Sequence, residues 1–137
     1  MIFLKNMNQL FLKEERLAAA AGALTPLQIV LDETIEYTRS RIAFGKPLLD
    51  NQCIHFRLAE LQTELDLVRS MLYMAADSYL QGQNVTLLAS MLKLKTGRLA
   101  REVTDSCLQF WGGKKIATYL LKANHAKNTT DHLLLVN

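Results

Sequence analysis

The chain has 137 residues, of which 50% are hydrophobic and 21% charged, and its formal net charge is +3. This length fits one domain, and the composition is that of a globular protein rather than a disordered one. We predict no nucleic-acid partner, because basic residues do not cluster with aromatic ones and no zinc-finger or basic-zipper spacing is present. Apolar runs are too short to predict a membrane span.

Cys53 and Cys107 lie far apart in the sequence and form no C-x-x-C motif. We therefore expect a reducing compartment in which both serve as small apolar residues. His125, Asp131 and His132 lie close together near the C-terminus. Their spacing matches no metal site, so we predict no bound metal.

The first predicted helix runs from about Leu12 to Thr38. Its apolar face would consist of Leu17, Ala21, Leu24, Leu31 and Ile35. Pro26 interrupts this stretch and leaves two alternatives. Thr25 could cap a second helix that starts at Pro26. Otherwise one helix bends at Pro26, with Gly22 leaving room for the proline ring.

A loop over residues 40–50 precedes the clearest helical signal in the sequence. Apolar residues there repeat at alternating steps of four and three, which is typical of helices packed lengthwise in a bundle. They are Ile54, Leu58, Leu61, Leu65, Val68, Leu72, Ala75 and Tyr79. Asp50 or Asn51 can cap the start of this helix, and Gly82 with Asn84 provides its stop.

The third predicted helix spans about Thr86 to Phe110, and Gly112-Gly113 ends it. Its apolar side would consist of Leu88, Met91, Leu92, Leu99, Val103 and Phe110. Residues 116–126 predict a further short helix, and no alternating strand pattern stands out. The sequence therefore predicts an all-α fold, an antiparallel up-down four-helix bundle with short loops.

Three local segments contain residues suited to ligand binding. Arg41 lies just beyond a predicted helix end, where a planar guanidinium can bind phosphate. Gly112-Gly113 would allow a ligand to approach the backbone closely. In residues 14–16 two glutamates precede an arginine, and a carboxylate beside a cation could serve as a base with a shifted pKa. On local physics alone a structural interpretation is favoured for each: a capped helix end, a helix stop and a solvated helix start.

Taken in order, these segments resemble the C-terminal domain of the acyl-CoA dehydrogenase family over about residues 13–113. Residues 15–24 are similar to the opening helix of that domain, and residues 39–48 to its R-x-x-F-G-K-P segment. Gln52 falls at a family glutamine, and residues 109–113 match Q-x-x-G-G. The separations between the segments also agree. The resemblance favours a single helix through Pro26.

The resemblance implies a flavoprotein that oxidises acyl-CoA thioesters by α,β-dehydrogenation with FAD. Arg41 would contact the pyrophosphate of a flavin held mainly by a neighbouring subunit. The other residues implied for cofactor binding are Phe44, Gln52, Gln109, Phe110, Trp111, Gly112 and Gly113. The implied partners are the acyl-CoA substrate, an electron-transfer flavoprotein and further copies of the chain, in a dimer or tetramer.

Lys13, Glu14, Glu15 and Arg16 would lie against the acyl-CoA, although Lys13 stands where several family members have Asp. In most members the catalytic base belongs to a Y-E-G-T segment, which does not follow residues 109–113 here. A branch similar to the isovaleryl and long-chain enzymes has its base within E-R-L of the first helix. Glu15 occupies that place and is the predicted base.

We therefore expect an N-terminal extension over residues 1–12, the helical bundle over 13–113 and a divergent tail over 114–137. The chain would be one domain of a parent enzyme, with little activity by itself. The alternative is a non-catalytic helical module that assembles with itself or with a longer partner. The expected location is the mitochondrial matrix in a eukaryote or the cytoplasm in a bacterium.

Overall fold

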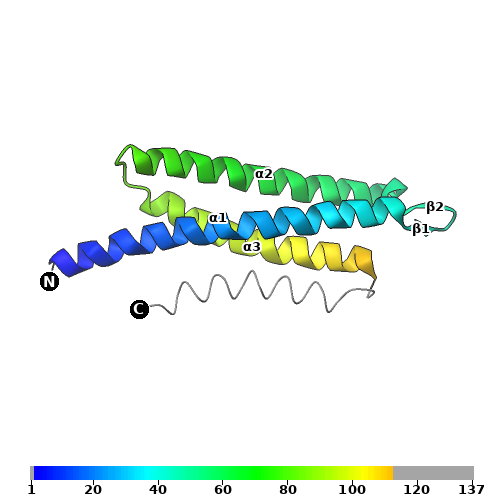
Figure 1. The fold of residues 1–137 in the computed structure, drawn as a ribbon, viewed down its shortest axis with the longest axis horizontal. Coiled ribbons are helices and arrows are strands. Elements are labelled where there is room, and N and C mark those ends of the chain that lie inside the picture. Colours follow the sequence, from blue (N-terminus) through cyan, green and yellow to red (C-terminus); the bar gives the residue numbers. More distant parts are fainter. Residues whose placement is uncertain (1, 113–137) are drawn as a thin grey trace.

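The computed structural model describes residues 2–112, with side chains from residue 12 onward. In this part of the chain three long helices pack against one another: α1 (Ile2–Ser40), α2 (Gln52–Leu80) and α3 (Thr86–Trp111) (Figure 1). The chain reverses direction at each connection, so α1 and α3 run parallel and α2 antiparallel to both. The all-α prediction is confirmed for the helices, whereas the predicted fourth helix over residues 116–126 lies outside the described residues.

A small hairpin and a short 3-10 helix connect α1 to α2. Strand β1 (Ile42–Ala43) pairs antiparallel with β2 (Lys46–Pro47), and η1 (Leu48–Asp50) follows. These residues were predicted to form a loop, and the sequence shows no alternating strand pattern there. Two-residue strands are too short to produce an alternating pattern, which needs about four residues to become visible.

Helix α1 is continuous through Pro26, as the resemblance favoured, and it begins well before the predicted Leu12. Thr25 therefore does not cap a second helix. A Cβ atom built on Gly22 would meet nothing within 4 Å, so the proline ring does not require glycine there. The lost hydrogen bond and the ring cost about 3 kcal/mol. Burial of Leu24 and Leu27 on either side of the ring offsets that cost.

The core lies along the seam where the three helices meet. The stripe predicted for α2 is confirmed: five members are buried, and Ile54, Leu72 and Tyr79 are half-buried. In α1 the buried residues are Ala20, Leu24, Leu27, Val30, Leu31, Thr34 and Thr38. Ala21, which was predicted on this face, is exposed. The heptad-like step of four and three therefore holds, but the stripe passes through Ala20.

The buried side of α3 differs more from its prediction. Its buried residues are Ala89, Leu92, Thr96, Leu99, Val103, Cys107 and Trp111. Met91 is 47% exposed, and Leu88 and Phe110 are half-buried. Small and polar residues occupy several core positions of this helix, while Met91 lies on the opposite face. Of the predicted stripe only Met91 is exposed, because Leu88 and Phe110 pack against the core cluster.

The predicted ends of α2 are partly confirmed. Gly82 has a positive φ of 74°, and its N–H donates to the carbonyl of Tyr79, which ends α2 in a left-handed turn. Asn51 holds the N-cap position, but its side chain donates to the carbonyl of Leu48 instead of accepting from the helix. Asn84 lies one residue before Val85, the N-cap of α3, and its Oδ1 accepts a hydrogen bond from the N–H of Thr86 at 3.1 Å.

Two buried threonine hydroxyls differ in their hydrogen bonding. Thr34 donates to the carbonyl of Val30 at 2.7 Å and accepts from the indole N–H of Trp111 at 3.1 Å. Thr96 is 3% exposed, and its hydroxyl has no hydrogen-bond partner among the described residues. A buried hydroxyl without a partner destabilises the fold, because the lost hydrogen bonds to water are not replaced.

Replacing Thr96 by valine is expected to raise the free energy of unfolding by about 1 kcal/mol. Valine keeps the shape of the side chain and removes the hydroxyl. Thr34→Val is the matched control, and it should lower the free energy of unfolding by about 1–3 kcal/mol, because the N–H of Trp111 loses its acceptor. Urea unfolding followed by circular dichroism measures both changes. A Thr96→Val variant less stable than the parent would contradict the prediction.

Candidate functional site

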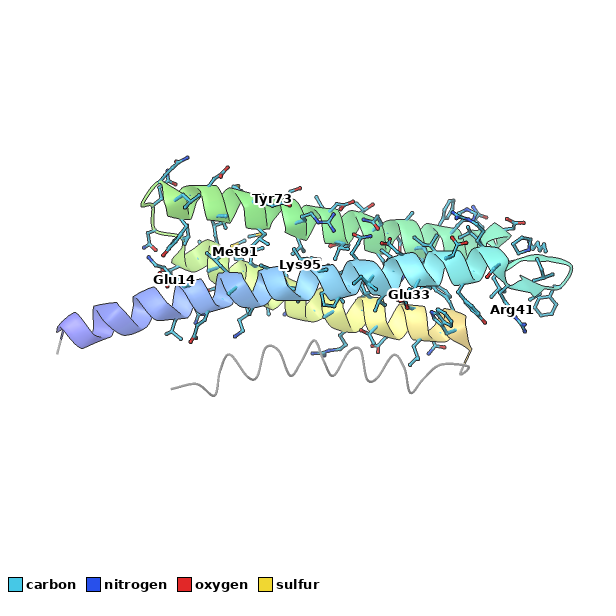
Figure 2. All side chains as sticks on the ribbon, in the orientation of Figure 1. Glu14, Glu33, Arg41, Tyr73, Met91 and Lys95 are labelled. Carbon is cyan, nitrogen blue, oxygen red and sulfur yellow. The ribbon has the colours of Figure 1, made fainter. Side chains whose placement is uncertain are left out.

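Arg41 lies at the end of the bundle where α1 meets the hairpin (Figure 2). Its side chain is exposed and forms no hydrogen bond or ion pair with the rest of the described chain. Its neighbour Arg39 instead pairs with Glu36 at 2.9 Å. Arg41 therefore presents a guanidinium whose N–H groups remain available to an anion such as phosphate.

The hairpin carries Phe44 at its tip. Phe44 and Gly45 have φ values of 53° and 82°, as both central residues of a tight type I′ hairpin turn require. Glycine adopts this conformation without strain, whereas a phenylalanine rarely does. The Phe44 side chain is also fully exposed, with a relative exposure of 101%. A large aromatic ring presented to solvent on a strained turn is typical of a residue that contacts a ligand or partner.

The end of α3 lies at the same end of the bundle as the hairpin (Figure 1). Gln109 and Gly112 are exposed there, and Gln52 is exposed at the start of α2. Trp111 is buried, and its ring stacks on Tyr37 with centroids 4.0 Å apart. Trp111 therefore supports the core rather than presenting its ring to a ligand.

Phe110 is half-buried and packs against the core cluster. Gly112 has a φ of 56° and ends α3 in the left-handed conformation that glycine adopts readily. Gly113 lies outside the described residues. The structure thus brings Arg41, Phe44, Gln52 and Gln109 to one end of the bundle as exposed side chains.

Lys13, Glu14, Glu15 and Arg16 lie toward the opposite end, where Figure 2 labels Glu14. Three of them are engaged by other helices. Glu14 accepts a short hydrogen bond from the Tyr79 hydroxyl, and Lys13 Nζ lies 5.6 Å from the centroid of the Tyr79 ring. Arg16 donates to the Ser90 hydroxyl at 2.8 Å.

Glu15 is half-buried, and its carboxylate forms no hydrogen bond or ion pair with other described residues. At 1.5 Å per residue, Glu15 and Arg41 lie about 39 Å apart along α1. One small ligand cannot touch both residues of the same chain. The predicted substrate residues and the predicted cofactor residues therefore form two separate sites.

The hydrogen bond to Glu14 raises the pKa of the Tyr79 phenol above its ordinary value, and partial desolvation acts in the same direction. The phenol can donate this hydrogen bond only while it is protonated, so the bond favours the neutral form of Tyr79. Tyr79 and Ser90 were not predicted as site residues. Tyr79 appeared only as the last member of an apolar stripe, and no sequence signal pairs it with Glu14.

The comparisons with known proteins decide the family. A profile described as "Acyl-CoA dehydrogenase, C-terminal domain" matches residues 5–129. The chain belongs to the acyl-CoA dehydrogenase family. The family inferred from the sequence motifs is confirmed, while the residue roles and the domain boundaries at residues 13 and 113 stay predictions.

This acyl-CoA dehydrogenase domain is similar to two curated relatives. It is 31% identical over 113 residues to the short-chain specific acyl-CoA dehydrogenase of Megasphaera elsdenii, which covers 82% of this chain and 30% of that protein. It is 34% identical over 98 residues to the CarC subunit of the caffeyl-CoA reductase-Etf complex of Acetobacterium woodii. That match covers 72% of this chain and 26% of CarC. The chain thus spans less than a third of the length of these relatives.

Solved structures give the same result for the fold. The domain superposes on butyryl-CoA dehydrogenase from Megasphaera elsdenii with a TM-score of 0.78 and 28% sequence identity. That match covers 93% of this chain and 36% of the other. The three-helix arrangement described here is therefore the arrangement of the corresponding part of that enzyme.

Residues 2–112 of the domain contain no group of three histidine, cysteine or acidic side chains placed to hold a metal ion. His125, Asp131 and His132 lie outside this range. In the same part of the chain, no helix has the length and apolar character that crossing a membrane requires.

Proposed function

We propose that this domain belongs to a longer FAD-dependent acyl-CoA dehydrogenase, which removes the α- and β-hydrogens of an acyl-CoA thioester. The observation that carries the proposal is the separation of two groups of candidate residues by the length of the continuous helix α1. Arg41 and Phe44 present a cation and an aromatic ring at one end, and Glu15 presents an unpaired carboxylate toward the other. The names of the relatives support the reaction class.

The hairpin end suits the adenosine diphosphate part of FAD. Arg41 would hold the pyrophosphate, because a guanidinium forms paired hydrogen bonds to phosphate oxygens. Phe44 would pack on the cofactor, and the exposed amides of Gln52 and Gln109 would bind its polar groups. When bound, the cofactor supplies a hydride acceptor for the β-hydrogen of the substrate.

Glu15 would remove the α-proton of the substrate. A general base needs an oxygen with a lone pair within hydrogen-bond reach of the proton, and an already paired carboxylate is less available. Of the four residues proposed to lie against the acyl-CoA, Glu15 is the one without a partner in the described chain. Glu14 and Arg16 would act mainly by holding the helix.

The two sites on one chain imply that at least two copies assemble. Arg41 of one copy would hold the cofactor next to which Glu15 of another copy acts, because the two residues of one chain are too far apart. We therefore propose a homo-oligomer, a dimer or tetramer. The relation to a subunit of an Etf complex supports an electron-transfer flavoprotein as the acceptor.

In the longer protein, Arg41→Ala is expected to weaken FAD binding by about 10- to 100-fold, because it removes charge-assisted hydrogen bonds of about 1.5–3 kcal/mol. Fluorescence titration of the apoprotein with FAD measures the change. Arg39→Ala is the matched control: it removes an exposed cation two residues away and should leave FAD affinity within twofold. Equal FAD affinity in the Arg41→Ala variant would contradict the cofactor assignment.

Glu15→Gln is expected to reduce turnover of acyl-CoA by at least about 100-fold, since an amide cannot accept the α-proton. Flavin absorbance should stay unchanged, and dye reduction with an acyl-CoA substrate measures the activity. Glu36→Gln, near the other end of the same helix, is the control. Full activity of Glu15→Gln would remove Glu15 from the mechanism, and a colourless, inactive longer protein would favour the assembly-module alternative.

A further inference from the structure

The residues on both sides of Glu15 are bonded to two different helices. Glu14 accepts a hydrogen bond from Tyr79 in the last turns of α2. Arg16 donates to Ser90 in the first turns of α3 at 2.8 Å. The Ser90 hydroxyl in turn donates to the carbonyl of Thr86 at 2.8 Å, which orients its oxygen toward Arg16. This part of α1 is therefore tied to both neighbouring helices.

Apolar packing holds this part of α1 less firmly than it holds the rest of the helix. None of the residues 12–19 is buried, and the buried stripe of α1 starts at Ala20. Leu17 is half-buried against the core. The hydrogen bonds of Glu14 and Arg16 add directional contacts to α2 and α3 on the two sides of Glu15.

Helix geometry gives the direction of the Glu15 side chain relative to these two bonds and to the core. Successive residues of a helix are rotated by about 100°, so Glu14 and Arg16 leave α1 on opposite sides of Glu15. By the same rule Glu15 is rotated by about 140° from Ala20 and about 180° from Leu24, which face the core. Glu15 therefore points away from the three-helix seam while its neighbours are fixed.

We propose that Tyr79 and Ser90 are positioning residues for Glu15. They hold the two neighbours of the base and so fix the direction in which its carboxylate meets the substrate. The inference rests on the proposed function, because it assigns a role relative to Glu15 as the base. Neither residue contacts the reacting atoms.

Loss of one tie is expected to affect the chemical step more than substrate binding. A base must come within about 2.6–3.2 Å of the proton that it removes. A displacement of about 1 Å can lower the rate by two orders of magnitude. We therefore expect Tyr79→Phe and Ser90→Ala to lower kcat about tenfold in the longer enzyme, with KM changed less than twofold.

Two further variants separate positioning from general loss of structure. Tyr73→Phe removes an exposed hydroxyl from the same helix α2, and Tyr73 has no hydrogen-bond partner in the described chain. This variant should keep the parent kcat. Ser90→Thr retains a hydroxyl that can accept from Arg16 and should restore kcat to within about twofold of the parent. If Ser90→Ala lowered kcat only by destabilising the enzyme, Ser90→Thr would not be expected to restore kcat.

A measurement on this chain tests the Tyr79 contact without turnover. The hydrogen bond to Glu14 raises the pKa of the phenol, so Tyr79 should titrate above its ordinary value of about 10. The difference between the ultraviolet titrations of the parent and Tyr79→Phe isolates this phenol from the other three tyrosines. A Tyr79 phenol that titrates at the ordinary pH would overturn the proposed tie.

The kinetic outcomes are distinguishable from failure of the proposed function. An inactive Glu15→Gln with a fully active Tyr79→Phe and Ser90→Ala overturns the positioning role and leaves the base assignment intact. A fully active Glu15→Gln overturns the base assignment, and the positioning role with it. Both the base assignment and the positioning role are supported by two results together. Tyr79→Phe and Ser90→Ala should have a low kcat with unchanged KM, and Tyr73→Phe and Ser90→Thr should have a kcat near that of the parent.

Discussion

The continuity of α1 through Pro26 is the constraint on which the rest of the structure depends. This one helix carries Glu15 toward one end and leads directly into Arg41 at the other. If α1 broke at Pro26, the two residues could approach each other, and one chain could form a complete site. Because the helix is unbroken, the two sites stay about 39 Å apart. The proposal that at least two copies assemble rests on that separation.

Packing against α2 and α3 keeps α1 straight enough for this role. Leu24 and Leu27 are buried on either side of Pro26, and Leu31 is completely buried one turn later. Toward the hairpin, Thr34 bonds to Trp111, whose ring stacks on Tyr37, so the last turns of α1 are tied to the end of α3. Toward Glu15, the half-buried Leu17 still packs on the core, and the hydrogen bonds of Glu14 and Arg16 add contacts to α2 and α3. No residue of α1 from 12 to 19 is fully buried.

The sequence predicted the helices well where large apolar residues mark the core. The leucine-rich stripe of α2 was identified almost completely. In α3 the core includes Ala89 and Thr96, whose size and polarity give no signal, and Met91, predicted as part of the stripe, is exposed. For Pro26, local rules left two alternatives, and only packing by other helices decides between them. The family motifs supplied the site residues, which local physics alone did not favour.

Contacts between distant residues explain most of what the sequence could not predict. Tyr79 meets Glu14 and Ser90 meets Arg16 only because the bundle brings the end of α2 and the start of α3 beside α1. Likewise, the burial of Trp111 depends on Thr34 and Tyr37, so a residue expected at the cofactor belongs to the core. Such pairings require the three-dimensional fold, because no periodicity or spacing in the chain encodes them.

Mixing two variants of the longer enzyme tests the central claim most directly. One variant carries Glu15→Gln and the other Arg41→Ala, and the assay uses an FAD concentration that fills the parent enzyme but leaves the Arg41→Ala variant largely empty, so that neither variant is active by itself. If every active site combines Glu15 of one copy with Arg41 of another, a mixed pair contains one site with both residues intact. Random exchange of subunits should then restore roughly a quarter of the parent activity in a dimer. Mixtures that remain as inactive as their components, although subunit exchange has occurred, would contradict the account.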